Sequence, residues 1–287
     1  MENRILVIGS SSWLGYLLLE ELSLKFPQMQ LASTIHKNKL KFNFNIKLYY
    51  FRNLQEYNII LKDFQPSLII NFLRGEDDQG MLLHNTIISY SKETNAYYIY
   101  ASSALALDAY SSSKELTEEV LANGKSEYGL FKANCEQSLY DSSSKWCILR
   151  FASVQGCVQH KLTRNENLLI KLSKGEKIIV DRGVYQNRMF ANLMIKGIVD
   201  LMNLKTEGII HFGTIDNSDE VDFLQKQAEI FGYSPKLIEM SSVERNVNLV
   251  CVPNRIFNIL GESFRVSEDD TLQSLSRIPD FKKYIKL

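Results

Sequence analysis

The amino-acid sequence predicts an α/β fold, in which a doubly wound parallel sheet is accompanied by a smaller C-terminal α/β lobe. Two observations predict this class. Up to residue 151, short and mostly apolar runs alternate with helical periodicity, which is typical of parallel strands that are buried on both faces. The last third of the 287-residue chain has shorter and more interrupted elements, too small for a second sheet half of the same kind.

The expected elements follow from this alternation. We expect strands over 4–8, 30–35, 46–51, 68–72, 97–101 and 146–151, and helices over 14–26, 53–64, 81–94 and 127–140. In the last third we expect helices over 167–174, 190–203 and 221–231, and strands over 177–180 and 208–212.

The first strand runs into a glycine turn. Gly9 permits the tight turn, and Gly15 lets the next helix pack closely on the strand. The helix start, with Ser12, Trp13 and Leu14, offers N–H groups and a positive dipole end to a pyrophosphate. Ser12 replaces the middle glycine of a G-x-x-G-x-x-G pattern, so a plain βα turn stays an alternative.

This turn predicts a Rossmann-type NAD(P)-binding domain. We place it over 1–155 and expect the chain to rejoin it over about 190–230. Residues 156–189 and 232–287 would then form a substrate-binding lobe at the carboxyl edge of the sheet, where ligands bind in open α/β folds.

The end of the second predicted strand is basic. A dinucleotide fold usually carries an Asp or Glu there to hold the adenosine ribose. This chain has His36, Lys37 and Lys39 instead, which would attract a 2′-phosphate. The position therefore favours NADP(H), with NAD(H) as the other cofactor to consider and a solvated basic loop as the structural alternative.

Composition limits the classes of function. Lysine plus arginine and aspartate plus glutamate are 33 each, so no polybasic surface for nucleic acid is expected. The four cysteines lack paired metal-type spacing, and we expect reduced thiols in a cytoplasmic protein with no metal. No apolar run reaches the ~18 residues that span a membrane, and no apolar signal segment follows Met1.

The strongest chemical signal lies between residues 97 and 132. A strand ends at Ser103, and Tyr128 and Lys132 follow on one face of a predicted helix. A free tyrosine, with a pKa of roughly 10, is a poor acid at neutral pH, but a nearby ammonium favours the phenolate. With a strand-end hydroxyl facing the same point, these groups can move a proton on or off an alcohol or ketone oxygen.

A second Tyr-x-x-x-Lys match, Tyr110 and Lys114, lies in a serine-rich loop where helical geometry is not assured. Ser126 is a suitable N-cap for the helix of Tyr128. We therefore assign the chemistry to Tyr128.

Several further segments occur in a specific order. They are VIGSSSWLG, PSLIINFL, HNTIISYSKETNAYYIYASSALAL, LTEE, EYGLFKANCEQ, LRFASVQG and RMFANLMIKGI. From residue 3 to about 265, this order resembles the extended short-chain dehydrogenase/reductase family, in its dTDP-4-dehydrorhamnose reductase-like (epimerase/dehydratase) branch.

The resemblance implies roles at the matching positions. Tyr128 would protonate the substrate oxygen as hydride arrives, Lys132 would hold the nicotinamide ribose, and Ser103 would hydrogen-bond the reacting carbonyl. Asn85 matches the helix asparagine of the family's proton relay, and Asn71 matches the asparagine of the fourth strand.

Two arginines are implied in substrate binding. Arg188 matches an arginine that contacts the substrate diphosphate, and Arg245 is a second candidate for the same role. A solvated arginine at Arg188 and a helix-surface amide at Asn85 are the structural alternatives.

Three positions depart from the family pattern. Ser12 replaces a glycine, Tyr50 stands where the family has an adenine-contacting Asp, and Gln155 replaces the aromatic before Gly156. These departures keep a non-catalytic, NADP-binding regulatory homologue open.

The resemblance also implies a reaction class. The Asp-Glu pair of the family's dehydratases is replaced by Ala104 and Leu105, and Leu105 also replaces the cysteine of its epimerase-reductases. The chain is therefore expected to reduce a 4-keto group on a nucleotide-diphosphate deoxysugar, for surface polysaccharide synthesis. A nucleotide-sugar 4-epimerase is the alternative, and helices 81–94 and 127–140 could pair in a homodimer.

Overall fold

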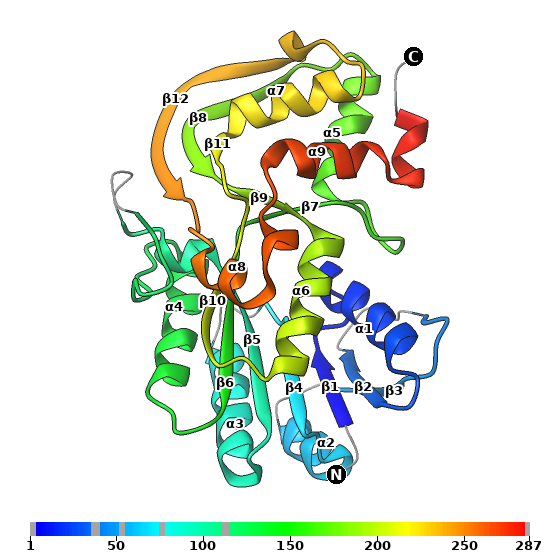
Figure 1. Cartoon of the computed structure of the whole chain (residues 1–287), viewed down its shortest axis with the longest axis vertical. Coiled ribbons are helices and arrows are strands. Elements are labelled where there is room, and N and C mark those ends of the chain that lie inside the picture. Colours follow the sequence, from blue (N-terminus) through cyan, green and yellow to red (C-terminus); the bar gives the residue numbers. More distant parts are fainter. Residues whose placement is uncertain (1–3, 36–40, 52–54, 75–77, 111–114, 285–287) are drawn as a thin grey trace. The chain divides into compact units, whose positions relative to one another are not determined.

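The computed structural model describes residues 4–35, 41–51, 55–74, 78–110 and 115–284, and it contains two compact units (Figure 1). Unit 1 comprises Met1–Ala106, Ala122–Arg150 and Ile195–Ile210, and unit 2 comprises Leu107–Leu121, Phe151–Met194 and His211–Leu287. Unit 2 includes residues 107–121, 151–155, 190–194 and 211–230, which we placed in the NAD(P)-binding domain from the sequence.

A central sheet of seven strands, counted over the described residues, has the order β10-β6-β5-β4-β1-β2-β3. Its strands are β1 (Arg4–Ile8), β2 (Gln30–Ile35), β3 (Lys47–Tyr50), β4 (Leu68–Asn71), β5 (Tyr97–Ser103), β6 (Trp146–Phe151) and β10 (Gly208–Phe212). The pairs β1–β2, β2–β3, β1–β4 and β4–β5 are parallel. The doubly wound α/β prediction is therefore confirmed, and the strand order reverses between β1 and β4.

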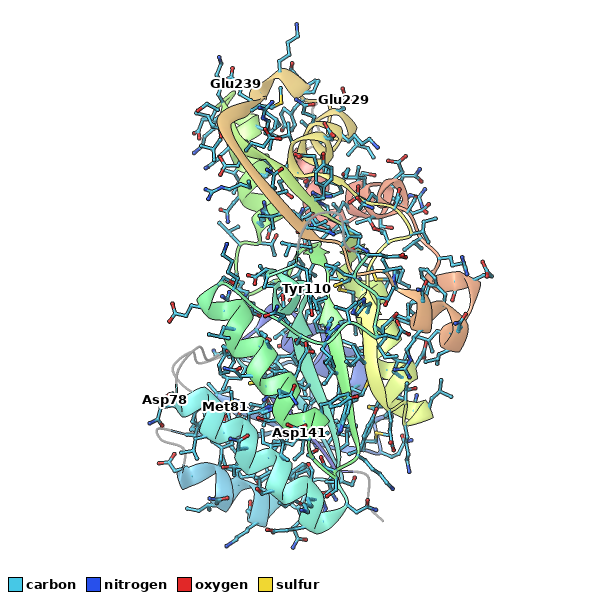
Figure 2. All side chains as sticks on the ribbon, turned by 90° about the vertical axis from the view of Figure 1, so that its left-hand side faces the viewer. Asp78, Met81, Tyr110, Asp141, Glu229 and Glu239 are labelled. Carbon is cyan, nitrogen blue, oxygen red and sulfur yellow. The ribbon has the colours of Figure 1, made fainter. Side chains whose placement is uncertain are left out.

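Five helices accompany these strands. They are α1 (Trp13–Lys25), α2 (Gln55–Phe64), α3 (Asp78–Thr94), α4 (Glu127–Tyr140) and α6 (Ala191–Leu204). Helices α3 and α4 contact each other, and Figure 2 labels Asp78 and Met81 on α3 and Asp141 at the end of α4. Bounds agree with prediction to within a few residues, and α4, β6 and β10 match it at both ends.

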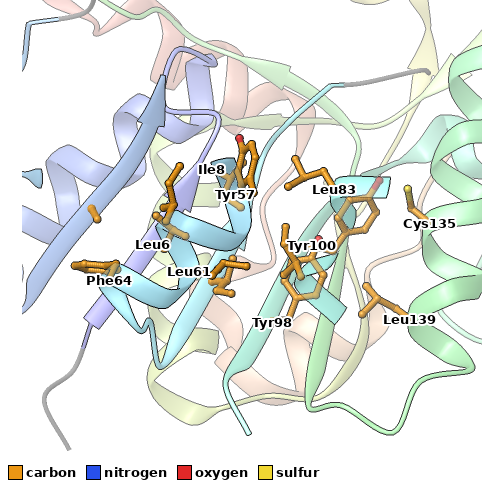
Figure 3. Close-up of a cluster of buried hydrophobic side chains, with 14 of the residues drawn as sticks. Leu6, Ile8, Tyr57, Leu61, Phe64, Leu83, Tyr98, Tyr100, Cys135 and Leu139 are labelled. Atoms are coloured by element: carbon orange, nitrogen blue, oxygen red, sulfur yellow. The ribbon is translucent and has the colours of Figure 1, made fainter. Parts of the chain in front are cut away.

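One face of the unit 1 sheet is packed by α2, α3 and α4. Leu6 and Ile8 of β1 meet Tyr57 and Leu61 of α2, and the same cluster continues to Leu139 of α4 (Figure 3). At about 1.5–3 kcal/mol for each large side chain removed from water, this cluster is a major source of stability for unit 1.

Unit 2 is built around a three-stranded sheet of order β11-β8-β12, in which the long strands β8 (Ile178–Gln186) and β12 (Ile238–Leu249) form a parallel ribbon beside the short β11 (Ser218–Asp219). Its other elements are β7 (Ser153–Gln155), α5 (Arg164–Ser173), β9 (Arg188–Phe190), α7 (Glu220–Ile230), α8 (Asn254–Leu260) and α9 (Glu268–Ser276). Helices α5, α7 and α9 enclose a second apolar cluster that includes Leu169, Phe223 and Leu275. The sequence predicted only the start of β8 and did not predict β12.

Arg188 lies inside unit 2 and is fully buried. Its Nη2 lies 2.8 Å from Glu220, and its Nη1 lies 2.5 Å from Glu268 and 2.9 Å from the carbonyl of Gln186. Burial raises the pKa of Glu268, and the Arg188 charge opposes that rise. The expected role of Arg188 as a diphosphate ligand is not supported, because two carboxylates already hold its guanidinium.

Replacing Gly15 by alanine should destabilise unit 1. A Cβ there would lie 2.5 Å from the carbonyl oxygen of Gly9, a backbone atom that cannot move aside cheaply. We expect a loss of about 1–3 kcal/mol in urea unfolding, although alanine is the better helix former. Leu24→Ala, on a 74% exposed side chain of the same helix, is the control and should cost far less. Equal losses would contradict the close-packing argument.

Replacing Arg188 by methionine should cost about 3–5 kcal/mol, because it leaves buried carboxylates without their cation. The deficit against wild type should shrink as the pH falls, since protonation removes the charge on Glu268. Arg245→Met is the matched control, because Arg245 is exposed and pairs with Asp181 at the surface. Chemical unfolding over a pH series measures both, and a pH-independent deficit would refute this account.

Candidate active site

The glycine turn follows β1, beside the point where the strand order reverses. Gly9 has φ +84°, and a Cβ on it would lie 3.1 Å from the backbone nitrogen of Leu73, so glycine is required here. The Ser12 N–H donates to the Gly9 carbonyl (2.9 Å), and Ser12 Oγ accepts from the Gly15 N–H (3.1 Å). Ser12 thus caps α1, whose first turn begins with Trp13 and Leu14.

Helix α4 begins in the same way and carries the candidate acid. Ser126 Oγ accepts from the Gly129 N–H at 3.0 Å, as predicted for an N-cap. Tyr128 is half-buried in the first turn, and Lys132 follows one turn later, only 2% exposed. The Lys132 ammonium donates to the carbonyl of Ala101 at 2.7 Å. This bond ties the helix of Tyr128 to the end of β5, where Ser103 is the last residue.

A buried ion pair secures the next turn of α4. The Arg150 guanidinium, on β6, donates to both oxygens of Glu136: Nη2 lies 2.7 Å and Nε 3.0 Å from Oε2, and Nε lies 3.2 Å from Oε1. The hydroxyl of Ser102 donates to the same carboxylate. All three side chains are at least 96% buried, so α4, β5 and β6 are joined directly behind Ser103.

Two cations face the ring of Tyr128. The Lys132 nitrogen lies 5.6 Å from the ring centroid, and the guanidinium carbon of Arg74 lies 4.5 Å from it. Arg74 follows β4 in the chain and was not predicted, because nothing in the local sequence links it to residue 128.

A buried polar network lies behind these residues. The Asn71 amide donates to the Tyr98 hydroxyl at 3.0 Å, and that hydroxyl is 2.9 Å from Nδ1 of His84. Burial lowers the pKa of His84 to about 4, with Lys132 contributing in the same direction. The neighbouring Asn85 is exposed on α3, whereas the side chain of His84 is polar and buried. The relay role of Asn85 therefore has no geometric support.

The remaining residues that the sequence singled out belong to unit 2, lie outside the described residues or are exposed. Arg188 and Arg245 belong to unit 2, and so does Tyr110, whose hydroxyl donates to the Leu121 carbonyl at 3.0 Å. His36, Lys37 and Lys39 lie outside the described residues. Tyr50, at the end of β3, is 59% exposed.

Gln155, the third departure from the family pattern, is buried in unit 2. Its amide oxygen accepts from Asn165 at 2.7 Å, and Asn165 in turn accepts from the Gly156 N–H. A hydrogen-bonded amide pair therefore holds the Gly156 turn where the family has an aromatic.

Two negative findings concern the part of the chain that the structure describes. It contains no group of three or more His, Cys, Asp or Glu side chains arranged to hold a metal ion. Within it, no helix combines the length and the hydrophobicity needed to cross a membrane.

Comparison with known proteins gives a fold but no sequence relative. No protein-family model and no curated protein sequence matches the chain. Among solved structures, the Bordetella bronchiseptica enzyme WbmH in complex with NAD+ matches with a TM-score of 0.79 and 15% identity, over 99% of both chains.

Two further structures are similar. The Thermotoga maritima UDP-glucose 4-epimerase with UDP-glucose has a TM-score of 0.79 and 16% identity, over 99% of this chain and 100% of that one. A hypothetical dTDP-4-dehydrorhamnose reductase from Sulfolobus tokodaii has a TM-score of 0.77 and 18% identity, over 93% and 98%. The α/β fold that the resemblance implied is thus confirmed: nearly the whole chain is similar in fold to these solved structures.

Proposed function

We propose that this chain is an NAD(P)-dependent oxidoreductase of the short-chain dehydrogenase/reductase type, acting on a nucleotide-diphosphate sugar. The observation that carries the proposal is the 2.7 Å bond from Lys132 to Ala101, which joins the helix of Tyr128 to the strand end of Ser103. Similar structures in complex with UDP-glucose, UDP-glucuronic acid and NAD support the substrate and cofactor classes.

In this proposal each residue has one task. Tyr128 gives its proton to the oxygen of a substrate carbonyl, and Ser103 donates a hydrogen bond to the same oxygen. Lys132, fixed by Ala101, keeps a positive charge beside the phenol and stabilises the phenolate that remains.

The turn between Gly9 and Gly15 fits a dinucleotide. Its two glycines leave no Cβ where backbone segments approach closely, as the motif needs. The Ser12 hydroxyl accepts a hydrogen bond from the Gly15 N–H at the start of α1. The start of α1 offers backbone N–H groups to a diphosphate. When bound, the reduced dinucleotide supplies the hydride.

We further propose that the reaction is reduction of a 4-keto group on a deoxysugar, in surface polysaccharide synthesis. The residues directly after Ser103 support this choice, since Ala104 is buried and neither it nor Leu105 can exchange a carbon-bound proton. A 4-epimerase would use the same tyrosine with a retained cofactor, and the similar fold of UDP-glucose 4-epimerases keeps this second candidate.

Replacing Tyr128 by phenylalanine should lower NADPH-dependent turnover of 4-keto nucleotide sugars by about 10²–10⁴-fold, because the proton donor is removed. Cofactor consumption with dTDP-, GDP-, CDP- and UDP-linked substrates measures it. Tyr110→Phe is the matched control, since it alters the other Tyr-x-x-x-Lys match, and it should retain wild-type rates.

Equal rates in wild type and Tyr128→Phe would overturn the mechanism. Turnover without added NADPH, by protein that copurifies with its cofactor, would identify the epimerase. Dinucleotide binding without turnover of any sugar in the panel would indicate the regulatory homologue.

Cofactor choice should depend on the basic segment after β2. We expect wild type to bind NADPH more tightly than NADH, and Lys37→Asp to weaken NADPH binding by about tenfold or more, through like-charge repulsion of the 2′-phosphate. Fluorescence titration measures both affinities. Lys25→Asp, which makes the same charge change at the end of α1, is the control. Equal affinity of wild type for the two cofactors would refute the preference.

A further inference from the structure

Arg74 is the one cation beside Tyr128 that the proposed function does not use, among the described residues. Its guanidinium carbon is 4.5 Å from the Tyr128 ring centroid, closer than the Lys132 nitrogen at 5.6 Å. A guanidinium stacked on an aromatic ring is attracted to the negative face of the ring. That attraction grows when the phenol ionises, because the ring system then carries a full negative charge.

The turn that carries Arg74 is fixed by Asn71, the last residue of β4. Asn71 is 3% exposed, and its Oδ1 accepts from the Leu73 N–H at 2.9 Å. An asparagine that bonds the backbone two residues ahead closes a tight turn. The conformation of the chain immediately before Arg74 is therefore set by a buried side chain rather than by a solvated loop.

The same asparagine is linked to α4 through buried, uncharged groups. His84 Nε2 lies 2.8 Å from the carbonyl of Cys135, which can only accept, so Nε2 carries the proton and Nδ1 accepts from Tyr98. The Tyr98 hydroxyl then accepts a hydrogen bond from the Asn71 amide. With the pKa of His84 at about 4, this series of hydrogen-bonded side chains is neutral at physiological pH. It joins the β4 turn to the helix of Tyr128.

We infer that Arg74 is a positioning residue for proton transfer from Tyr128, an inference that rests on the proposed function. In the transfer, the O–H bond of Tyr128 breaks and a new O–H bond forms on the substrate oxygen. The electron pair and one negative charge stay on the phenol oxygen. Arg74 stabilises that charge and holds the ring, and so acts more strongly on the ionised state than on the phenol.

Two cations lie over the ring of Tyr128, and a carboxylate precedes Tyr128 in the chain. Arg74 follows β4, Lys132 lies on α4 itself, and the exposed Glu127 precedes Tyr128 in the chain. Strand β5 ends at Ser103, whose side chain is uncharged. Removing Arg74 takes away the cation whose centre is nearer to the ring.

The test compares Arg74→Gln, Arg74→Lys and, as a charge-loss control at the end of α3, Lys92→Gln. Ultraviolet difference titration of each protein against its Tyr128→Phe counterpart isolates the ionisation of this one phenol. We expect Arg74→Gln to move the midpoint up by about one pH unit, a tenfold change in the ionised fraction. Arg74→Lys should keep the midpoint close to the wild-type value, because it retains the positive charge, and Lys92→Gln should leave the midpoint unchanged.

Turnover gives a second readout. Arg74→Gln should lower kcat about tenfold at neutral pH with little change in KM, and should move the alkaline decline of activity to higher pH, since the weaker acid keeps its proton longer. If Arg74 had only a structural role, its replacement would lower activity without moving the alkaline decline of the pH–activity profile.

The outcomes separate the two proposals. A titration midpoint in Arg74→Gln equal to that of wild type overturns the inference about Arg74, whatever the turnover. A shifted midpoint in proteins that turn over no keto-sugar nucleotide supports the coupling of Arg74 to Tyr128 and overturns the proposed reaction instead.

Discussion

Glu136 and Arg150 form a buried ion pair between α4 and β6, and the position of the candidate acid follows from it. Buried charges are tolerated only when they are fully paired, so the carboxylate must keep the guanidinium on one side and the Ser102 hydroxyl on the other. Lys132, one helical turn earlier, adds a bond to Ala101. A helix shifted along its axis would break both sets of bonds, which fixes the helix that carries Tyr128 against β5 and β6.

The fold of unit 1 was predictable because its strands are short apolar runs between clear helix signals. The bounds of β1, β2, β6, β10 and α4 follow directly from such signals. In unit 2, the sequence predicted only the start of β8 and none of β12, because much of the β8–β12 ribbon is polar and exposed and because bulges interrupt its pairing. Alternation of apolar residues, the signal that predicts a strand, is absent from such a ribbon.

The candidate site was predictable only where a local pattern encodes it. Tyr128 and Lys132 share a helix face, and the cap at Ser126 follows from residue type. Arg74 and His84 act through contacts with residues far away in the chain, which no local pattern encodes. Arg188 shows a related ambiguity: an arginine that binds phosphate and one that binds buried carboxylates look alike in sequence, and the burial of the side chain is not encoded locally.

The interleaved segments of unit 1 have a consequence for synthesis on the ribosome. Strand β10, the outer neighbour of β6, is translated only after residues 151–194, which belong to unit 2. Until then β6, with Cys147, Ile148 and Leu149, remains an open and apolar border on the nascent chain, the kind of surface that templates unwanted pairing. No single proteolytic cut yields either unit whole, so the two must mature as one translational product.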